Sequence, residues 1–234
     1  MTSSDLTKAL RELANPEIAA HSQRFFKTGK GEYGEGDVFL GIRVPVLRKQ
    51  ATKFKDLSLA NLSRSLKSQY NEVRLCTLFI LVKQFERGND AERKKIYDLY
   101  LESTEFVNNW DLVDSSAHKI VGPHLVHRDR RILTKLAKSK SLWERRISIM
   151  STLEFIRRGD YADTLAISEI LLNDPEDLIH KAVGWMLREV GNKDPQVERR
   201  FLATTYDRMP RTMLRYAIEK FPDVERKKYL NGEV

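Results

Sequence analysis

A tryptophan and two carboxylates lie within five residues of one another in the stretch NNWDLVDSSAH, as Trp110, Asp111 and Asp114. Acidic side chains are unexpected there because the chain carries a formal net charge of +8. One interpretation is structural: an aspartate at a helix start caps free N–H groups, and a second carboxylate in the first turn is favoured by the helix dipole. The other is chemical, because an acid kept within a basic binding surface needs a task that offsets its repulsion of anions.

Stabilising a developing cation is one such task for Asp114. When the N-glycosidic bond of an alkylated purine breaks, the sugar becomes oxocarbenium-like, and a nearby carboxylate stabilises that charge and orients the attacking water. A purine alkylated at a ring nitrogen is itself a cation and stacks favourably on tryptophan. It leaves as a neutral base, so this reaction needs no general acid.

The chain has three tryptophans for such stacking: Trp110, Trp143 and Trp185. A tryptophan on an amphipathic helix is commonly part of the core. The alternative expectation is that Trp110 and Trp185 project toward one concave surface, together with the basic side chains Arg146 and Lys181 that lie near the tryptophans in the sequence.

Composition favours a polyanionic partner. The 41 Lys and Arg exceed the 33 Asp and Glu, which gives a pI of about 9.5 and suits nucleic acid or an anionic membrane surface. The single cysteine, Cys76, lies in the apolar run LCTLFILV, so we expect a core thiol in a reducing compartment. The N-terminal stretch MTSSDLTKAL has no apolar signal segment, and the longest apolar run, residues 78–82, is too short to span a bilayer. We therefore expect a cytoplasmic protein without a membrane partner.

Other site chemistries find little support in the sequence. The five histidines form no HExxH pattern and have no cysteine partners, and no serine has a nucleophile's turn, so neither a metal nor another cofactor is expected. The segment 27–45 holds five of the eleven glycines but no GxxxxGK[ST], so it is no phosphate cradle. We expect a surface loop there, either a flexible edge of a DNA groove with Lys30, Tyr33 and Arg43 as contacts or a plain connection.

Helices must position these side chains. Proline, glycine and capping residues cut the chain into about a dozen segments with apolar residues at i, i+3, i+4 and i+7, and no alternating strand pattern occurs. A capping serine precedes LTKALRELA, Pro16 suits a first helical turn, and Asp174 with Pro175 repeats that device before a helix ending at Gly191.

The helices repeat with a fixed period. NEVRLCTLFILVKQFERG aligns with WERRISIMSTLEFIRRG so that Arg146 lies 72 residues after Arg74; Lys181 follows 35 residues later, and Arg215 a further 34. A basic residue near the start of the second helix of each pair is typical of a HEAT-like array. The sequence therefore predicts an all-α fold, with residues 1–234 as a single-domain curved solenoid of HEAT-like antiparallel helix pairs and a basic concave surface.

One repeat departs from this pattern. Asp114 aligns with Arg74 after a shift of a few residues, because its offsets of 40 and 32 are uneven. An acid thus stands where the sister repeats carry Arg or Lys.

The chain resembles the AlkD-like DNA alkylation-repair glycosylases, a family built from HEAT-like repeats, in four stretches taken together: FLGIRVPVLR (39–48), WDLVDSSAHKIVG (110–122), WERRISIMSTLEFIRRG (143–159) and KAVGWMLREVG (181–191). The resemblance implies that Trp110 and Trp185 hold the lesion-bearing nucleotide, that Asp114 acts on the oxocarbenium and the water, and that Arg146 contacts the adjacent phosphate. It further implies that the chain excises cationic lesions, such as 7-methylguanine and 3-methyladenine, from double-stranded DNA by a metal-free monofunctional hydrolysis. The resemblance also implies that the damaged base stays largely stacked in the duplex instead of being flipped into a pocket.

Phe25, Lys30, Arg43 and Lys181 complete the expected DNA contacts, alongside Arg146. Phe25 stands where the family has a tyrosine, which bears on substrate range. We expect a monomer. The alternatives are a non-catalytic HEAT-like scaffold for nucleic acid or protein, in which the two aspartates only cap a helix, and a family member that senses unusual DNA without cutting it.

Overall fold

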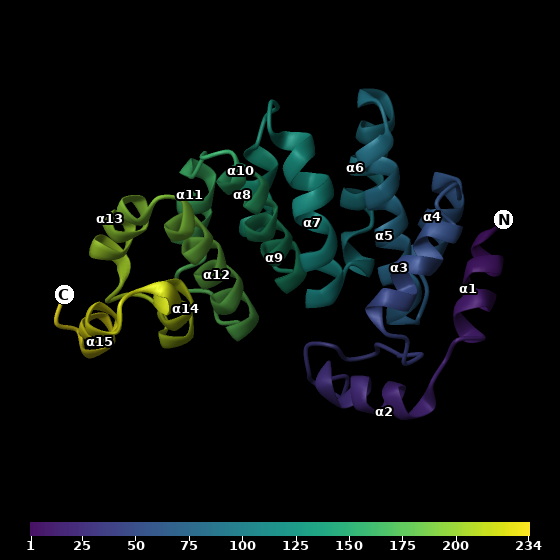
Figure 1. The fold of residues 1–234 in the computed structure, drawn as a ribbon, viewed down its shortest axis with the longest axis horizontal. Helices are drawn as coiled ribbons and strands as arrows, with labels where there is room; N and C mark the ends of the chain where they lie inside the picture. Colours follow the sequence, from purple (N-terminus) through teal and green to yellow (C-terminus); the bar gives the residue numbers. More distant parts are fainter. The chain divides into compact units, whose positions relative to one another are not determined.

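The computed structural model describes all 234 residues of the chain and is helical throughout (Figure 1). The one β pairing is an isolated parallel bridge between Val38 and Tyr70. The all-helical prediction is therefore confirmed. The chain divides into two compact units, Met1–Ser116 and Ala117–Val234.

The first unit consists of α1 (Ser3–Arg11), α2 (Pro16–Phe25), α3 (Val44–Lys53), α4 (Leu59–Leu66), α5 (Asn71–Arg87), α6 (Asp90–Glu102), the 3-10 turn η1 (Thr104–Phe106) and the start of α7 (Trp110–Leu125). Its central helix is α5, which is buried on nearly all sides from Val73 to Val82. A helix that is apolar all round is stable only when other helices cover it. Helices α3, α4 and α6 do so, and Figure 1 shows them beside α5.

Helix α2 lies across this group rather than along it (Figure 1). The segment that precedes α3 passes so close to the start of α2 that a Cβ on Gly41 would lie 2.1 Å from the carbonyl oxygen of Asn15. Gly41 also has a φ of +79°, which disfavours any other residue. This glycine therefore lets the segment before α3 pack against the start of α2.

The glycine-rich segment is anchored along its second half. Asp37, Phe39 and Leu40 are buried, the N–H of Asn15 donates to the Leu40 carbonyl at 2.8 Å, and the N–H of Phe39 donates to Oε1 of Gln23 at 2.9 Å. The expectation of a flexible edge is wrong for this half, because backbone and buried side chains hold it. The exposed turns lie before it and carry Lys30.

The second unit consists of the rest of α7, α8 (Arg131–Ala137), α9 (Leu142–Ser151), α10 (Leu153–Arg157), α11 (Ala162–Ile170), α12 (Asp177–Lys193), α13 (Pro195–Thr205), α14 (Arg211–Ala217), the 3-10 turn η2 (Ile218–Lys220) and α15 (Asp223–Asn231). Helix α12 packs against α9, α13 and α14. A Cβ on Gly184 would lie 2.4 Å from the carbonyl oxygen of Met213, so glycine permits the close approach of α12 and α14.

Two of the predicted helix starts are displaced. Thr2, not a serine, caps α1, in a capping box with Asp5. Helix α12 begins at Asp177 rather than directly after Asp174, and the proline device predicted for it occurs instead at α13, where Asp194 accepts the N–H groups of Gln196 and Val197.

The recurrent basic residues fall on equivalent positions of their helices. Arg74 is the fourth residue of α5, and Arg146, Lys181 and Arg215 are the fifth residues of α9, α12 and α14. Asp114 is likewise the fifth residue of α7. The shifted alignment of Asp114 with the basic series thus agrees with the helix boundaries.

Candidate functional site

An aromatic stack fixes the first turn of α7. The rings of Trp110 and Phe26 lie 5.0 Å apart at an interplanar angle of 11°. Phe26 also stacks on Phe39 at 4.7 Å and meets Phe25 edge-on at 5.2 Å. Phe25 meets Trp110 edge-on at 6.0 Å, and its side chain is 58% exposed. Each aromatic pair contributes about 0.5–1.5 kcal/mol beyond area burial, so the indole is held in one orientation.

The three tryptophans are half-buried rather than core residues. Trp110 shows part of its indole next to the exposed Phe25, and Trp185 donates its Nε1–H to Oε1 of Glu189, one turn further along α12, at 3.0 Å. Each of the three is therefore neither fully buried nor fully exposed.

Asp114 lies one turn after Trp110 and is half-buried. Side chains four residues apart share a helix face, so the indole and this carboxylate lie along the same side of α7. The negative charge of Asp114 also acts on a core residue, Tyr100, whose hydroxyl forms a hydrogen bond with Oγ of Ser116 at 2.9 Å. Burial raises the pKa of the Tyr100 hydroxyl, and the charge of Asp114 raises it further.

Asp111 has a different environment from Asp114. Its carboxylate accepts a long hydrogen bond from Nδ2 of Asn71 at 3.4 Å. Burial raises the pKa of Asp111 to about 7 against the lowering effect of that bond, and the charge of Asp37 raises it further. The N–H of Trp110, the first residue of α7, donates to Oδ1 of Asn109 at 2.9 Å. The Asp111 carboxylate also has a backbone hydrogen bond with Leu112, which lowers its pKa slightly.

A buried ion pair supports this end of α7. Arg74 and Asp37 form a direct pair in which both side chains are almost fully buried, and Arg74 also donates to the Ser68 carbonyl at 2.7 Å. Nδ2 of Asn109 donates to Asp37 at 2.8 Å. The first basic residue of the repeat series therefore holds the structure together instead of lining a basic surface, which corrects the expectation for Arg74.

Glu72, two residues before Arg74, holds the segment that precedes α3 in place. Its carboxylate accepts the backbone N–H groups of Leu40 and Gly41 at 2.8 Å each, and that of Ile42 at 3.2 Å. Three donors around one buried carboxylate offset much of the cost of removing it from water.

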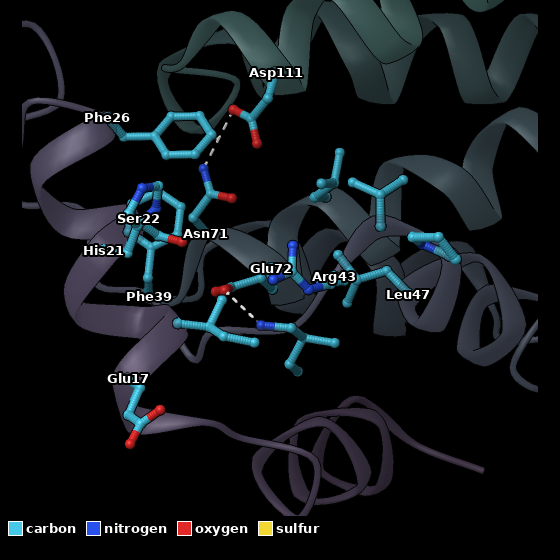
Figure 2. Close-up of a pocket in the computed structure, with 15 residues that line it drawn as sticks. Glu17, His21, Ser22, Phe26, Phe39, Arg43, Leu47, Asn71, Glu72 and Asp111 are labelled. Carbon is cyan, nitrogen blue, oxygen red and sulfur yellow. Dashed lines mark hydrogen bonds between the residues drawn. The ribbon is translucent and has the colours of Figure 1, made fainter.

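A pocket of about 690 Å³ opens beside the aromatic stack, between α2, the start of α3 and the start of α5 (Figure 2). Its walls are largely apolar, and its polar side chains include His21, Arg43, Asn71, Glu72 and Asp111. Pockets of this size and composition are typical small-ligand sites.

The predicted DNA contacts of the first unit are all accessible. Phe25 lies beside Trp110, Arg43 is exposed at the mouth of the pocket as the residue before α3, and Lys30 is exposed in the glycine-rich turns. Phe25 and Arg43 thus lie near the start of α7, whereas nothing in the structure brings Lys30 to Trp110.

The predicted residues of the second unit are more constrained. Arg146 is buried and donates to the Leu178 carbonyl. Lys181 forms an ion pair with Asp177 at 2.7 Å, in which both side chains remain substantially exposed. Lys181 is therefore accessible to a polyanion, whereas Arg146 is held in place by α12.

Three further residues, Phe26, Asn71 and Asp37, belong to this site and were not predicted from the sequence. The doublet Phe25–Phe26 was a visible signal, because two adjacent aromatic residues at a helix end cannot both be buried by that helix alone. Asn71 and Asp37 gave no local signal, since their partners are far away in the sequence.

Cys76 is fully buried, and burial raises the pKa of its thiol to about 12, as expected for a core cysteine. No three or more His, Cys, Asp or Glu side chains gather where they could hold a metal ion. None of the helices has the length and apolar character needed to cross a bilayer.

Fold and site together define an all-helical protein that presents an exposed phenylalanine, a half-buried tryptophan and a half-buried carboxylate near one helix start. The family model for the DNA alkylation repair enzymes matches residues 6–221, and the chain belongs to this family. A solved structure described as a predicted DNA alkylation repair enzyme from Enterococcus faecalis is similar in fold: its TM-score is 0.68 at 17% sequence identity, over 90% of this chain and 97% of that one. No curated protein matches the sequence. Family membership assigns the chain a role in the repair of alkylated DNA.

Proposed function

We propose that the chain is a monofunctional DNA glycosylase that hydrolyses the N-glycosidic bond of cationic alkylpurines, such as 7-methylguanine and 3-methyladenine, in duplex DNA. The observation that carries the proposal is the placement of Trp110 and Asp114 on one side of α7, with Phe25 exposed beside the indole. In this proposal the enzyme needs no cofactor, acts as a monomer, and leaves the lesion largely stacked in the duplex.

Asp114 supplies the chemistry in this proposal. As the glycosidic bond lengthens, positive charge develops on the sugar, and a carboxylate nearby lowers the energy of that state. The half-buried position of Asp114 strengthens this effect, because a charge at the edge of a low-dielectric core is screened less than one in water. The same carboxylate orients the attacking water, and the departing base leaves neutral.

The aromatic side chains favour a cationic base over a normal one. Trp110 is fixed by its stack with Phe26, so its free surface loses little entropy when a charged purine or its sugar approaches. The proposal assigns Trp185 to the lesion-bearing nucleotide as well. It assigns the accessible Lys181 to the phosphate backbone. It assigns Arg146 there as well, and this buried guanidinium would have to turn from the Leu178 carbonyl to make that contact.

The decisive experiment measures release of free 7-methylguanine from methylated duplex DNA by the wild-type protein and by Asp114→Asn. We expect the substitution to lower the single-turnover rate by about 10²–10³-fold, the usual effect of removing one electrostatic stabiliser of a transition state. DNA binding and the unfolding curve should be preserved, since Asn keeps the shape of Asp.

The matched control is Asp98→Asn, because Asp98 is a partly exposed acid on α6 that forms an ion pair with Lys94. This control should release the base at the wild-type rate. Equal rates for Asp114→Asn and the wild type would refute the assignment of Asp114. No release by the wild type would leave a DNA-binding protein without glycosylase activity.

A further inference from the structure

The pocket beside α2 contains a polar group that nothing in the chain satisfies. Asn71 is 1% exposed, and its Oδ1 has no hydrogen-bond partner. The orientation of the amide is fixed, because Nδ2 faces two carboxylates, Asp37 at 3.5 Å and Asp111 at 3.4 Å. A buried acceptor without a donor costs about 1–3 kcal/mol, so this oxygen indicates a ligand that donates hydrogen bonds.

Asp111 adds a second acceptor to the same wall. Figure 2 shows its carboxylate next to the Asn71 amide, with one oxygen directed toward the amide nitrogen. Both residues line the pocket. The third carboxylate, that of Glu72, is occupied by three backbone N–H groups. The deep wall thus offers Asp111 and Asn71 as acceptors side by side.

The rest of the pocket defines the shape and charge of its ligand. Apolar side chains from α2, α3 and α5 line the pocket, among them Ile18, Leu47 and Leu75. They suit a ligand with a flat or compact apolar part. Arg43 is exposed and lines the same pocket, so its guanidinium can bind an anionic group of the ligand. The ligand is therefore apolar in its faces, rich in N–H donors at one end and anionic at the other.

We propose that this pocket binds a guanine nucleotide through the Watson–Crick edge of its base. The N1–H and one amino hydrogen of guanine donate to the carboxylate of Asp111, the second amino hydrogen donates toward Oδ1 of Asn71, and Arg43 binds the phosphate. A carboxylate that accepts two adjacent N–H groups is the usual complement of this edge. The nucleotide comes either from the free pool or from an unpaired position in a DNA strand, and the site is independent of the excision chemistry at Asp114.

The test measures binding by NMR, through backbone amide shifts of the ¹⁵N-labelled full chain titrated with dGMP, dIMP and dAMP. Shifts should be confined to α2 and to the starts of α3, α5 and α7. We expect dGMP to bind about tenfold more tightly than dIMP, which lacks the 2-amino group, because one hydrogen bond to a charged group is lost. An oligonucleotide with one bulged guanine identifies the source: tighter binding than dGMP assigns the site to DNA, and equal or weaker binding assigns it to free nucleotides.

The variant Asp111→Asn removes the charged acceptor and preserves the pocket shape. It should weaken dGMP binding at least about tenfold and abolish the preference over dIMP. Its matched control is Glu17→Gln, since Glu17 is an exposed acid at the rim of the same pocket and should leave binding unchanged. Absence of binding by both dGMP and the bulged strand, or binding that ignores the base and the Asp111 substitution, would overturn the proposal.

Discussion

The substitution Asp111→Asn should stabilise the protein near neutral pH. Burial holds the pKa of Asp111 at about 7, whereas the ordinary pKa of an aspartate in an unfolded chain is 3.8. Between these values the folded protein keeps a proton that the unfolded chain has released, so the free energy of unfolding falls as the pH rises through this window. Asparagine does not titrate and should remove this loss.

The size of the effect follows from the two pKa values. At about 1.4 kcal/mol per pH unit, the interval from 3.8 to about 7 sets an upper limit of about 4 kcal/mol. Glu198, whose pKa burial raises to about 8, titrates in an overlapping range, but it is present in both proteins and cancels in their difference.

The assay is urea unfolding followed by far-UV circular dichroism, for wild type and variant, from about pH 5 to about pH 8. The stability of the wild type relative to Asp111→Asn should decrease from about pH 5 to about pH 7 and level off above the pKa of the folded state. Asp129→Asn serves as the control, because the hydrogen bond with Arg131 lowers the pKa of Asp129 and places its titration in more acidic solution. If the curves of Asp111→Asn and wild type run parallel, the reasoning about this buried carboxyl is refuted.

Three further outcomes test the fold and the interface. Gly41→Ala should destabilise the first unit by more than about 2 kcal/mol in urea unfolding, because the added Cβ would clash with the Asn15 carbonyl oxygen. Gly31→Ala is the control: Gly31 has the same φ of +79° but open space around it, so the substitution should cost only about 1 kcal/mol. Equal losses for the two variants would contradict the packing argument. Arg74→Met should lower the free energy of unfolding by about 3–5 kcal/mol, because it leaves the Asp37 carboxylate buried without its cation. A thermal or urea midpoint equal to that of the wild type would show that the ion pair is not needed for stability. DNA binding measured by fluorescence anisotropy should weaken steeply between about 50 and 200 mM salt if several phosphate contacts form, and a flat salt dependence would exclude a basic binding surface.

The helical fold and the core of the candidate site could be predicted from local sequence. Apolar residues at i, i+3, i+4 and i+7 predict a helix because a helix buries one stripe of its surface. This pattern can be recognised without knowing which segments the helix packs against. The four-residue spacing of Trp110 and Asp114 likewise fixes their common face once α7 is helical. Repeat spacing placed Arg146 and Lys181 near the starts of α9 and α12 for the same reason.

Tertiary structure alone decided which charges are available for function. Arg74 and Lys181 look equivalent in the sequence, yet Arg74 is buried against Asp37, 37 residues earlier, and Lys181 is paired on an accessible helix surface. Asp111 and Asp114 also look alike, but only Asp111 meets Asn71, from a helix 40 residues away. Burial and ion pairing depend on which segments pack together, and such long-range packing sums many weak contacts that no single stretch of sequence contains.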